Sequence, residues 1–289
     1  MTMPGLRRWK SSCARSTASR SPCLQAPRRK MRVPDTERAA LAAAAAREAG
    51  RYLRESRRSP LAEAVLPHDV KLEQDRRSEE MILCRISQAF PDDGWLSEES
   101  GERRSASGYV WVVDPLDGSV NYFQGIPHCC VSIACRGNSG PLLGVVYDFF
   151  RDELFAAEAG KGAFLNGSRI RVSATRNLSE AVMAFGLMKD PREIAAGLAV
   201  LSRLAAQVKK VRMMGSAALD LCYVASGRAD LFVEFGLKPW DVAAGALILG
   251  EAGGILQEEE TQGMRMSVAS NGLIQPRWRG TTRRIRGEK

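Results

Sequence analysis

The chain has 289 residues, of which 45% are hydrophobic and 26% charged, and its formal net charge is +9. This length allows one large domain or two medium ones, and the composition excludes a chain that is disordered throughout. Because it contains no apolar run of about eighteen residues, we expect no transmembrane helix. A total of 2 histidines argues against a His-rich zinc centre.

Most of the positive charge lies at the two ends of the chain. Residues 1–30 contribute +8 and residues 277–289 contribute +5, so the body, 31–276, has a net charge of −4. The net charge is therefore a weak argument for a nucleic-acid partner, which stays an alternative. A membrane partner is not expected.

The first thirty residues are rich in Ser, Arg and Pro and have no hydrophobic period, so we expect them to be disordered. They lack the apolar core of a secretory signal, but their composition fits an organelle transit peptide. We favour Met31 as the native start, because a helical pattern begins directly after it. The 7 cysteines form no C-x-x-C pair, which favours reduced thiols and a cytoplasmic protein, with organelle targeting as the alternative.

The chain predicts two helices, then a strand-rich middle, then alternating helices and strands. Helices are predicted over 35–56, 73–90, 191–207, 216–226 and 240–251. Strands are predicted over 109–113, 129–135, 142–147 and 230–235, with a hairpin turn at 166–167. This order predicts an α/β protein made of an α+β half and an α/β half.

The predicted organisation has four segments. A basic extension covers 1–30, and an N-terminal α+β half with a metal site covers 31–178. A C-terminal α/β half that completes the site covers 179–276, and a basic tail covers 277–289.

Acidic residues follow apolar segments at three places. An apolar strand ends at Val113 and is followed at once by Asp114 and Asp117. Acids at the carboxyl end of a strand face the crevice where α/β proteins bind ligands. Glu98 comes just after an apolar pair, and Asp241 opens an otherwise apolar helix.

These four acids could share one pocket. Two carboxylates about 4 Å apart repel by about 4 kcal/mol at an effective dielectric of about 20, so such a pocket needs cations. Oxygen ligands without Cys or His favour a hard ion, Mg²⁺ before Ca²⁺ or Mn²⁺. Mg²⁺ pairs with phosphate, so the acids predict phosphoryl transfer to water. The simpler interpretation is that each acid is only a solvated turn or helix-end residue.

Three blocks of sequence resemble the inositol monophosphatase family, the lithium-sensitive Mg²⁺-dependent sugar phosphatases. The blocks are Ser97-Glu98-Glu99-Ser100, Asp114-Pro115-Leu116-Asp117-Gly118-Ser119 and Pro239-Trp240-Asp241-Val242-Ala243-Ala244-Gly245. The resemblance covers about 35–275. It implies a layered αβαβα sandwich, a homodimer, and a small phosphorylated polyol or sugar as substrate.

The resemblance also implies roles for individual residues. Two or three Mg²⁺ ions would be held by Glu98, Asp114, the carbonyl of Leu116, Asp117 and Asp241. The implied catalytic residues are Glu98, Ser119 and Asp117, with Ser119 and Glu98 orienting and activating the attacking water. The implied substrate contacts are Asp117, Ala217 and Glu234 for hydroxyls, and the N–H groups of Gly118 and Ser119 for phosphate.

The sequence departs from the family pattern in two regions. His68–Asp75 replaces the usual Asp-Leu-Val-Thr-x-x-Asp, although Asp75 still matches the final acid. The family's closing C-terminal helix is also missing. The predicted substrate is inositol monophosphate or a similar polyol phosphate. Alternatives are fructose-1,6-bisphosphate, histidinol phosphate, 3′-phosphoadenosine 5′-phosphate and NADP, a catalytically dead homologue, and a nucleic-acid-associated scaffold that uses the basic termini.

Overall fold

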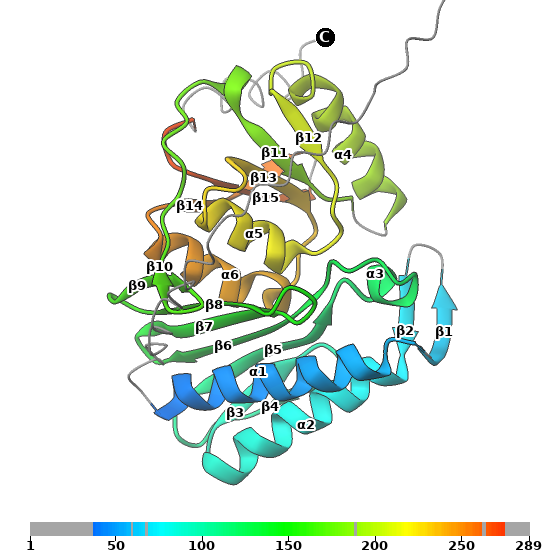
Figure 1. Cartoon of the computed structure of the whole chain (residues 1–289), viewed down its shortest axis with the longest axis vertical. Helices are drawn as coiled ribbons and strands as arrows, with labels where there is room; N and C mark the ends of the chain where they lie inside the picture. Colours follow the sequence, from blue (N-terminus) through cyan, green and yellow to red (C-terminus); the bar gives the residue numbers. More distant parts are fainter. Residues whose placement is uncertain (1–36, 59, 67–68, 188–189, 262–263, 275–289) are drawn as a thin grey trace, which may run out of the picture. The chain divides into compact units, whose positions relative to one another are not determined.

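The computed structural model describes residues 37–58, 60–66, 69–187, 190–261 and 264–274. The predictions for residues 1–30 and 277–289, and for His68, lie outside these residues. The described residues belong to one structural unit, in which helices and sheets alternate in layers (Figure 1).

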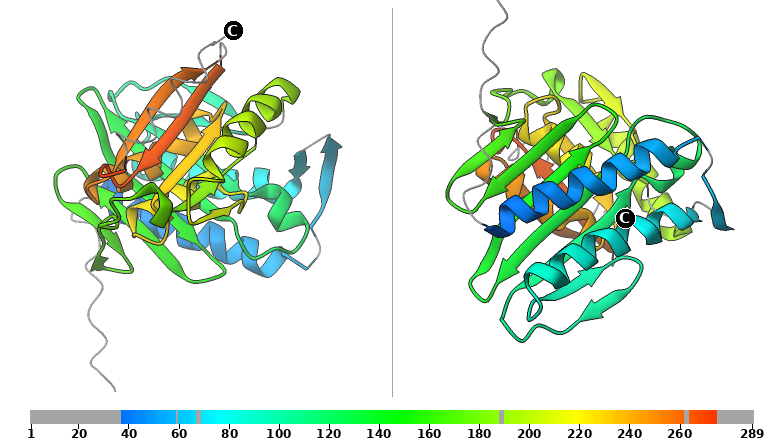
Figure 2. Two further views of the ribbon diagram at one scale, coloured as in Figure 1. Left: turned by 90° about the horizontal axis from the view of Figure 1, so that it is seen from above. Right: turned by 60° about the horizontal axis from the view of Figure 1, so that its bottom comes forward.

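An eight-stranded sheet forms the first β layer. Its strand order is β10-β9-β8-β7-β6-β5-β3-β4; β3 and β5 pair in parallel, and the other neighbours are antiparallel. The strands are β3 (Gly94–Ser97), β4 (Gly101–Arg103), β5 (Val110–Asp117), β6 (Cys130–Gly137), β7 (Gly140–Asp148), β8 (Glu153–Glu158), β9 (Gly162–Leu165) and β10 (Ser168–Arg169). Helices α1 (Glu37–Ser56) and α2 (Glu73–Ala89) cover one of its faces (Figure 2).

A five-stranded sheet forms the second β layer, in the order β12-β11-β13-β15-β14. β11 pairs in parallel with β12 and β13, whereas β15 is antiparallel to both of its neighbours. The strands are β11 (Val182–Phe185), β12 (Lys210–Arg212), β13 (Leu231–Phe235), β14 (Ile255–Thr261) and β15 (Met264–Ser270).

Helices α5 (Ala217–Ala225) and α6 (Pro239–Glu251) pack against each other and lie between the two sheets. Helix α4 (Pro191–Leu204) covers the outer face of the five-stranded sheet. The order of layers is therefore αβαβα, and the predicted fold class is confirmed. Within the described ranges, no helix is long and apolar enough to cross a membrane.

Three short elements complete the described structure. A hairpin of β1 (Ala62–Leu66) and β2 (Asp69–Leu72) joins the first two helices, and β2 contacts the short helix α3 (Ser119–Phe123). A single turn of 3₁₀ helix, η1 (Leu178–Glu180), precedes the second sheet. The predicted division of the chain at 178/179 stays a prediction.

The predicted helices are confirmed to within a few residues at each end, but one strand is longer than predicted. The strand expected to stop at Val113 continues through the acidic segment to Asp117. Its pairing with β6 shifts between Asp114 and Asp117. Pro115 lies in this interval and has no N–H to donate, so an irregularity in the ladder is expected there. The strand thus carries both acids instead of ending before them.

Candidate active site

The end of β5 places three predicted site residues in one short segment. Asp114 is buried, and its Oδ1 accepts the N–H of Leu116 at 3.1 Å. The Ser119 hydroxyl donates to the Leu116 carbonyl at 3.0 Å. The backbone of Leu116 therefore holds both side chains, Asp114 through its N–H group and Ser119 through its carbonyl group.

Gly118 makes the turn from β5 into α3 possible. Its φ of +94° lies in the left-handed region, which residues with a side chain rarely adopt. A Cβ at this position would stand 3.0 Å from Cβ of Cys129 and 3.1 Å from the carbonyl oxygen of His128. The turn therefore needs glycine for both its backbone conformation and its space.

Asp117 links the first sheet to helix α5. Its Oδ2 accepts the Ser216 hydroxyl at 2.7 Å and the Ala218 N–H at 2.8 Å, across 99 and 101 positions of sequence. The start of a helix suits a carboxylate, because its first N–H groups have no partners within the helix. Burial nevertheless raises the pKa of Asp117 more than these hydrogen bonds lower it. Because Ala217 opens α5, the same contact brings a predicted substrate residue beside Asp117.

Helix α2 contributes Asp75 to the same region. Its carboxylate accepts the N–H of Leu72 at 3.2 Å, and its Oδ1 lies 3.5 Å from the Ser119 hydroxyl oxygen. Burial, together with the nearby charges of Glu98 and Glu99, raises the pKa of Asp75 to about 8, although Lys71 and the Leu72 bond act in the opposite direction.

Glu98 and Asp241 approach Asp114 from two other elements. Glu98 follows β3 and is half-buried, and Asp241 lies in the first turn of α6, where its Oδ2 accepts the Lys238 N–H at 2.7 Å. Burial raises the pKa of Asp114 well above its usual value, and the charges of Glu98, Asp117, Asp241 and Asp75 raise it further. The predicted acids therefore interact electrostatically around Asp114.

Glu234 lies on β13, in the second sheet. It is 8% exposed, and its carboxylate lies so close to Gly186 that a Cβ there would fall 2.0 Å from its Cδ. Burial raises the pKa of Glu234 well above its usual value, with further contributions from Asp220, Asp117 and Asp241. The predicted substrate contact is thus placed within electrostatic reach of the predicted metal ligands.

Two buried acids close to the predicted site residues were missed by the sequence reasoning. Glu79 on α2 accepts the Ser97 hydroxyl and the Glu99 N–H, the latter at 3.0 Å, and so holds the segment around Glu98. Asp220 on α5 is 1% exposed, and its Oδ1 has no hydrogen-bond partner among the described residues. No local signal marks either acid, because an acid within a helix is exposed in most proteins.

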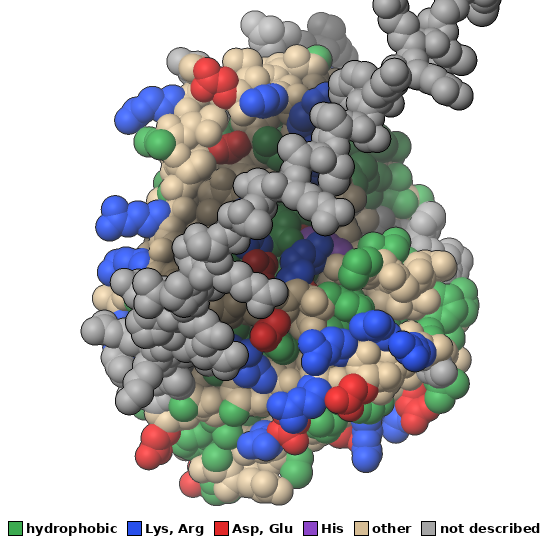
Figure 3. Space-filling model, viewed as in Figure 1, with side chains coloured by type: hydrophobic (Ala, Val, Ile, Leu, Met, Phe, Trp, Pro, Cys, Tyr) green, Lys and Arg blue, Asp and Glu red, His purple; other side chains and the backbone are tan. Residues whose placement is uncertain are grey.

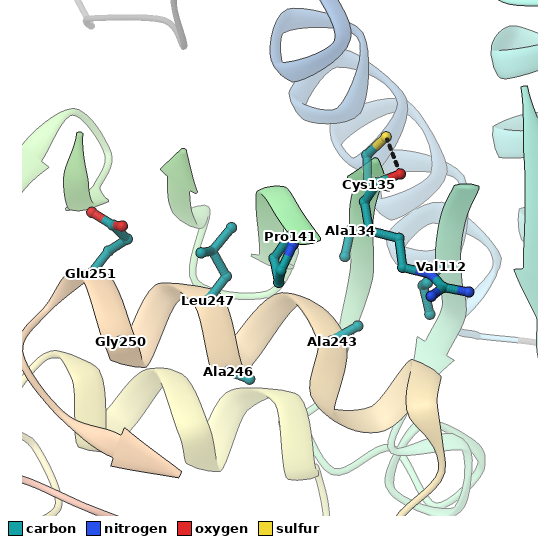
Figure 4. Close-up of a pocket in the computed structure, with 10 residues that line it drawn as sticks. Val112, Ala134, Cys135, Pro141, Ala243, Ala246, Leu247, Gly250 and Glu251 are labelled. Carbon is teal, nitrogen blue, oxygen red and sulfur yellow. Dashed lines mark hydrogen bonds between the residues drawn. The ribbon is translucent and has the colours of Figure 1, made fainter. Parts of the chain in front are cut away.

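A separate pocket of about 340 Å³ lies between α6 and the eight-stranded sheet (Figure 4). Val112, Ala134, Leu247 and Glu251 are among its lining residues. It includes none of the predicted site residues, and the acids described above do not line it.

A hard divalent cation fits the donor set around Asp114. Asp114 and Asp117 form no ion pair with Lys, Arg or His in the described part of the chain, so their negative charge is not neutralised by a side chain. All their candidate companions are oxygen donors. No three Asp, Glu, His or Cys side chains of the described residues are already arranged as a metal centre. Instead, hydrogen bonds hold Asp114 and Asp241 each within its own segment, and they hold Asp117 against Ser216 at the start of α5.

Comparison with known proteins decides the family. The model of the inositol monophosphatase family matches residues 35–286. The chain belongs to the inositol monophosphatase family. Among its relatives, Nus factor SuhB of Escherichia coli K12 is 40% identical over 223 residues, which are 75% of this chain and 84% of that protein.

Solved structures of the family share the fold. The extragenic suppressor protein suhB from Bartonella henselae superposes with a TM-score of 0.79 at 37% identity, covering 86% of this chain and 98% of that one. An inositol monophosphatase from Anabaena superposes with a TM-score of 0.71 at 38% identity, covering 81% and 90%. The predicted family is thereby confirmed, and family membership supports phosphatase activity.

Proposed function

We propose that this protein is a Mg²⁺-dependent phosphomonoesterase that hydrolyses inositol monophosphate or a similar polyol or sugar phosphate. The observation that carries the proposal is the buried Asp114 carboxylate, which is surrounded by other acids and is paired with no basic side chain of the described residues. The proposal includes the predicted homodimer, lithium sensitivity and cytoplasmic location.

Five groups would hold two or three Mg²⁺ ions: Glu98, Asp114, the Leu116 carbonyl, Asp117 and Asp241. When bound, the cations lower the pKa of the attacking water and stabilise the charge on the leaving oxygen. Because the acids come from β5, the turn after β3 and α6, the assembled fold is needed to bring them together.

Ser119 and Glu98 would orient the attacking water. The Ser119 hydroxyl donates its proton to the Leu116 carbonyl, so its oxygen keeps lone pairs that can accept a hydrogen bond from water. The half-buried Glu98 carboxylate can accept the second hydrogen and take up the proton. The N–H groups of Gly118 and Ser119 would bind the phosphate oxygens.

Glu234, Ala217 and Asp117 would form the hydroxyl-binding side of the site. Glu234 is a buried carboxyl group that forms no ion pair within the described ranges, and such a group is well suited to hydrogen bonds with sugar or cyclitol hydroxyls. This favours a polyhydroxyl substrate. Fructose-1,6-bisphosphate, histidinol phosphate, 3′-phosphoadenosine 5′-phosphate and NADP remain the alternative substrates.

The test is Mg²⁺-dependent phosphate release from inositol monophosphate and the four alternatives. We expect the parent to release phosphate fastest from inositol monophosphate or another polyol phosphate, and Asp114→Asn to release almost none. Asp92→Asn makes the same chemical change at an exposed position and should retain the parent's rate. No release from any of the five compounds would refute the proposal.

The relatives named Nus factor SuhB favour a second candidate, a Nus-factor role. In this chain, such a role could use the basic ends to bind nucleic acid, although those ends lie outside the described residues. Deleting residues 1–30 should then remove a steeply salt-dependent binding to RNA without changing phosphate release. If the shortened chain binds RNA as the parent does, the extension plays no such part.

A further inference from the structure

Helix α1 presents a line of arginines to solvent. Arg47, Arg51 and Arg54 recur at spacings of four and three residues, so they share one side of the helix, and Arg58 follows in the turn after it. We call these four residues the arginine row. At a rise of about 1.5 Å per residue, the helical part of the row spans about 10 Å. Figure 3 shows Lys and Arg side chains gathered over this end of α1.

Most of the row has no acidic partner, in contrast to the neighbouring helix. On α2, Arg76 and Arg77 pair with Glu80 and Arg85 pairs with Glu48 of α1. In the described ranges, Arg51, Arg54 and Arg58 form no ion pair, and Arg47 alone reaches an acid, Asp152, at 3.2 Å. Like charges three or four positions apart destabilise a helix. Arg54 lies in the last turn, where the helix dipole favours a cation, but this does not account for Arg47 and Arg51 earlier in the helix.

The row borders a groove of about 210 Å³ between α1 and the end of β7. Gly50 allows the close approach, because a Cβ there would stand 2.7 Å from the Tyr147 ring. The Arg47 guanidinium lies 5.2 Å from the centre of that ring, and this cation–π interaction helps to hold the Arg47 side chain in position. Tyr147 is only 7% exposed and Phe149 1% exposed, so neither ring offers a free face on which a base could stack.

We propose that the arginine row binds the phosphate backbone of a single-stranded nucleic acid. Guanidinium groups match phosphate oxygens through paired N–H donors, and one line of charges matches one strand. The large hydrophobic side chains that are exposed in the described structure lie outside α1. On α1 itself a protein partner would find none of the apolar anchors that form the centre of most interfaces, and the exposed Leu61 and Val65 belong to the segment after the row. Because the two rings of the groove offer no stacking face, binding is expected to depend on phosphate contacts and to tolerate any base sequence.

The row is separate from the proposed active site. Its contacts with Tyr147 and Asp152 involve neither the predicted ligands nor the substrate residues. Phosphate release and nucleic-acid binding can therefore be measured independently in the same protein.

The experiment compares two triple variants of the full chain. Arg51→Gln, Arg54→Gln and Arg58→Gln remove three charges of the row, whereas Arg76→Gln, Arg77→Gln and Arg85→Gln remove three charges from the paired arginines of α2. Binding to a fluorescent single-stranded RNA of about 20 nucleotides is followed by anisotropy from about 50 to 200 mM KCl. Because each phosphate contact contributes about 0.7 to the salt slope of a single strand, the row variant should lose about 2 from the slope.

We expect the row variant to bind at least about tenfold more weakly in low salt, and the α2 variant to bind like the parent. Phosphate release should be the same in all three proteins. The proposal is overturned if the parent does not bind the RNA or if the row variant keeps the parent's affinity and salt slope. It is also overturned if both variants lose the same amount of RNA affinity. If the row variant melts at a lower temperature, Arg51→Gln alone is used, with an expected slope loss of about 0.7.

Discussion

Replacing Gly118 with alanine tests the geometry of the turn that joins β5 to α3. The substitution forces a residue with a Cβ to adopt a φ of +94°. It also places that Cβ 3.0 Å from Cys129 Cβ and 3.2 Å from the Gly215 carbonyl oxygen. The turn can therefore resist alanine both through its backbone and through crowding.

The two costs can be separated with Gly101 as a control. Gly101 has a φ of +76°, but a Cβ there would meet nothing within 4 Å. The left-handed conformation costs a residue with a Cβ about 1–2 kcal/mol, and overpacking adds about 1–3 kcal/mol. Gly118→Ala should therefore cost about 2–5 kcal/mol, and Gly101→Ala about 1–2 kcal/mol. The entropy that alanine removes from the unfolded chain is the same in both variants and cancels.

Urea unfolding of the parent and both variants gives the two free-energy changes. Gly118→Ala should also release phosphate more slowly, because the N–H groups proposed to bind the phosphate move with the turn. If Gly118→Ala is no more destabilising than Gly101→Ala, the crowding inferred around residue 118 does not exist. If its phosphate release equals the parent's, the turn is not part of the active site.

Three further outcomes are expected. Without Mg²⁺, Asp114→Asn should unfold at the same or a higher urea concentration than the parent, since it removes a buried charge. Added Mg²⁺ should raise the melting temperature of the parent but not of the variant. Equal shifts in melting temperature would exclude Asp114 as a ligand. Li⁺ at millimolar concentration should inhibit phosphate release, and a rate that does not change would indicate a different metal site. Burial raises the pKa of Asp93, but hydrogen bonds from Arg38, Ser107 and Trp111 lower it more, so its net shift is downward. The contribution of the Asp93 charge to folding stability is therefore complete above its unfolded pKa of about 3.9. It is lost as the pH falls through the lower pKa of the folded state. The stability difference between the parent and Asp93→Asn should shrink in that acidic range, and a difference that is constant down to pH 2 would contradict this linkage.

The parts of the fold that the sequence predicts are those with local signals. The apolar spacing of Ile82 and Ile86 marks the buried side of α2, and both residues are buried. Asn166 and Gly167 have φ values of +47° and +79°, the conformation that an Asn-Gly hairpin turn requires. Gly253, with a φ of +91°, ends α6 as a C-terminal glycine should.

One missed strand depends on its pairing partner and not on its own residues. The segment Gln257–Thr261 consists of polar residues, yet it forms part of β14 because β15 pairs with it along its length. β14 is an edge strand, so its side chains need not form a buried apolar face. No local pattern distinguishes such a strand from a loop.

The site residues also fall into two groups, those with a local sequence signal and those without one. Asp114 and Asp117 follow the apolar run that begins β5, so sequence reasoning could select them. The burial of Asp220 depends on α5 lying between two sheets, and the role of Glu79 depends on its bonds to Ser97 and Glu99. An acid in a helix is exposed in most proteins, and only the packed structure distinguishes these two from ordinary surface acids.

The contact between Asp117 and the start of α5 gives the site a dependence on assembly. Asp117 belongs to the first sheet and Ser216 to the segment that opens the helix layer behind it, 99 positions later. A nascent chain that has completed only the eight-stranded sheet lacks Ser216 and Ala218, which donate to this carboxylate, and lacks Asp241 as well. Catalytic activity should therefore appear during refolding only when the long-range contacts of Asp117 have formed. The recovery of phosphate release would then report the rate of this last step of folding.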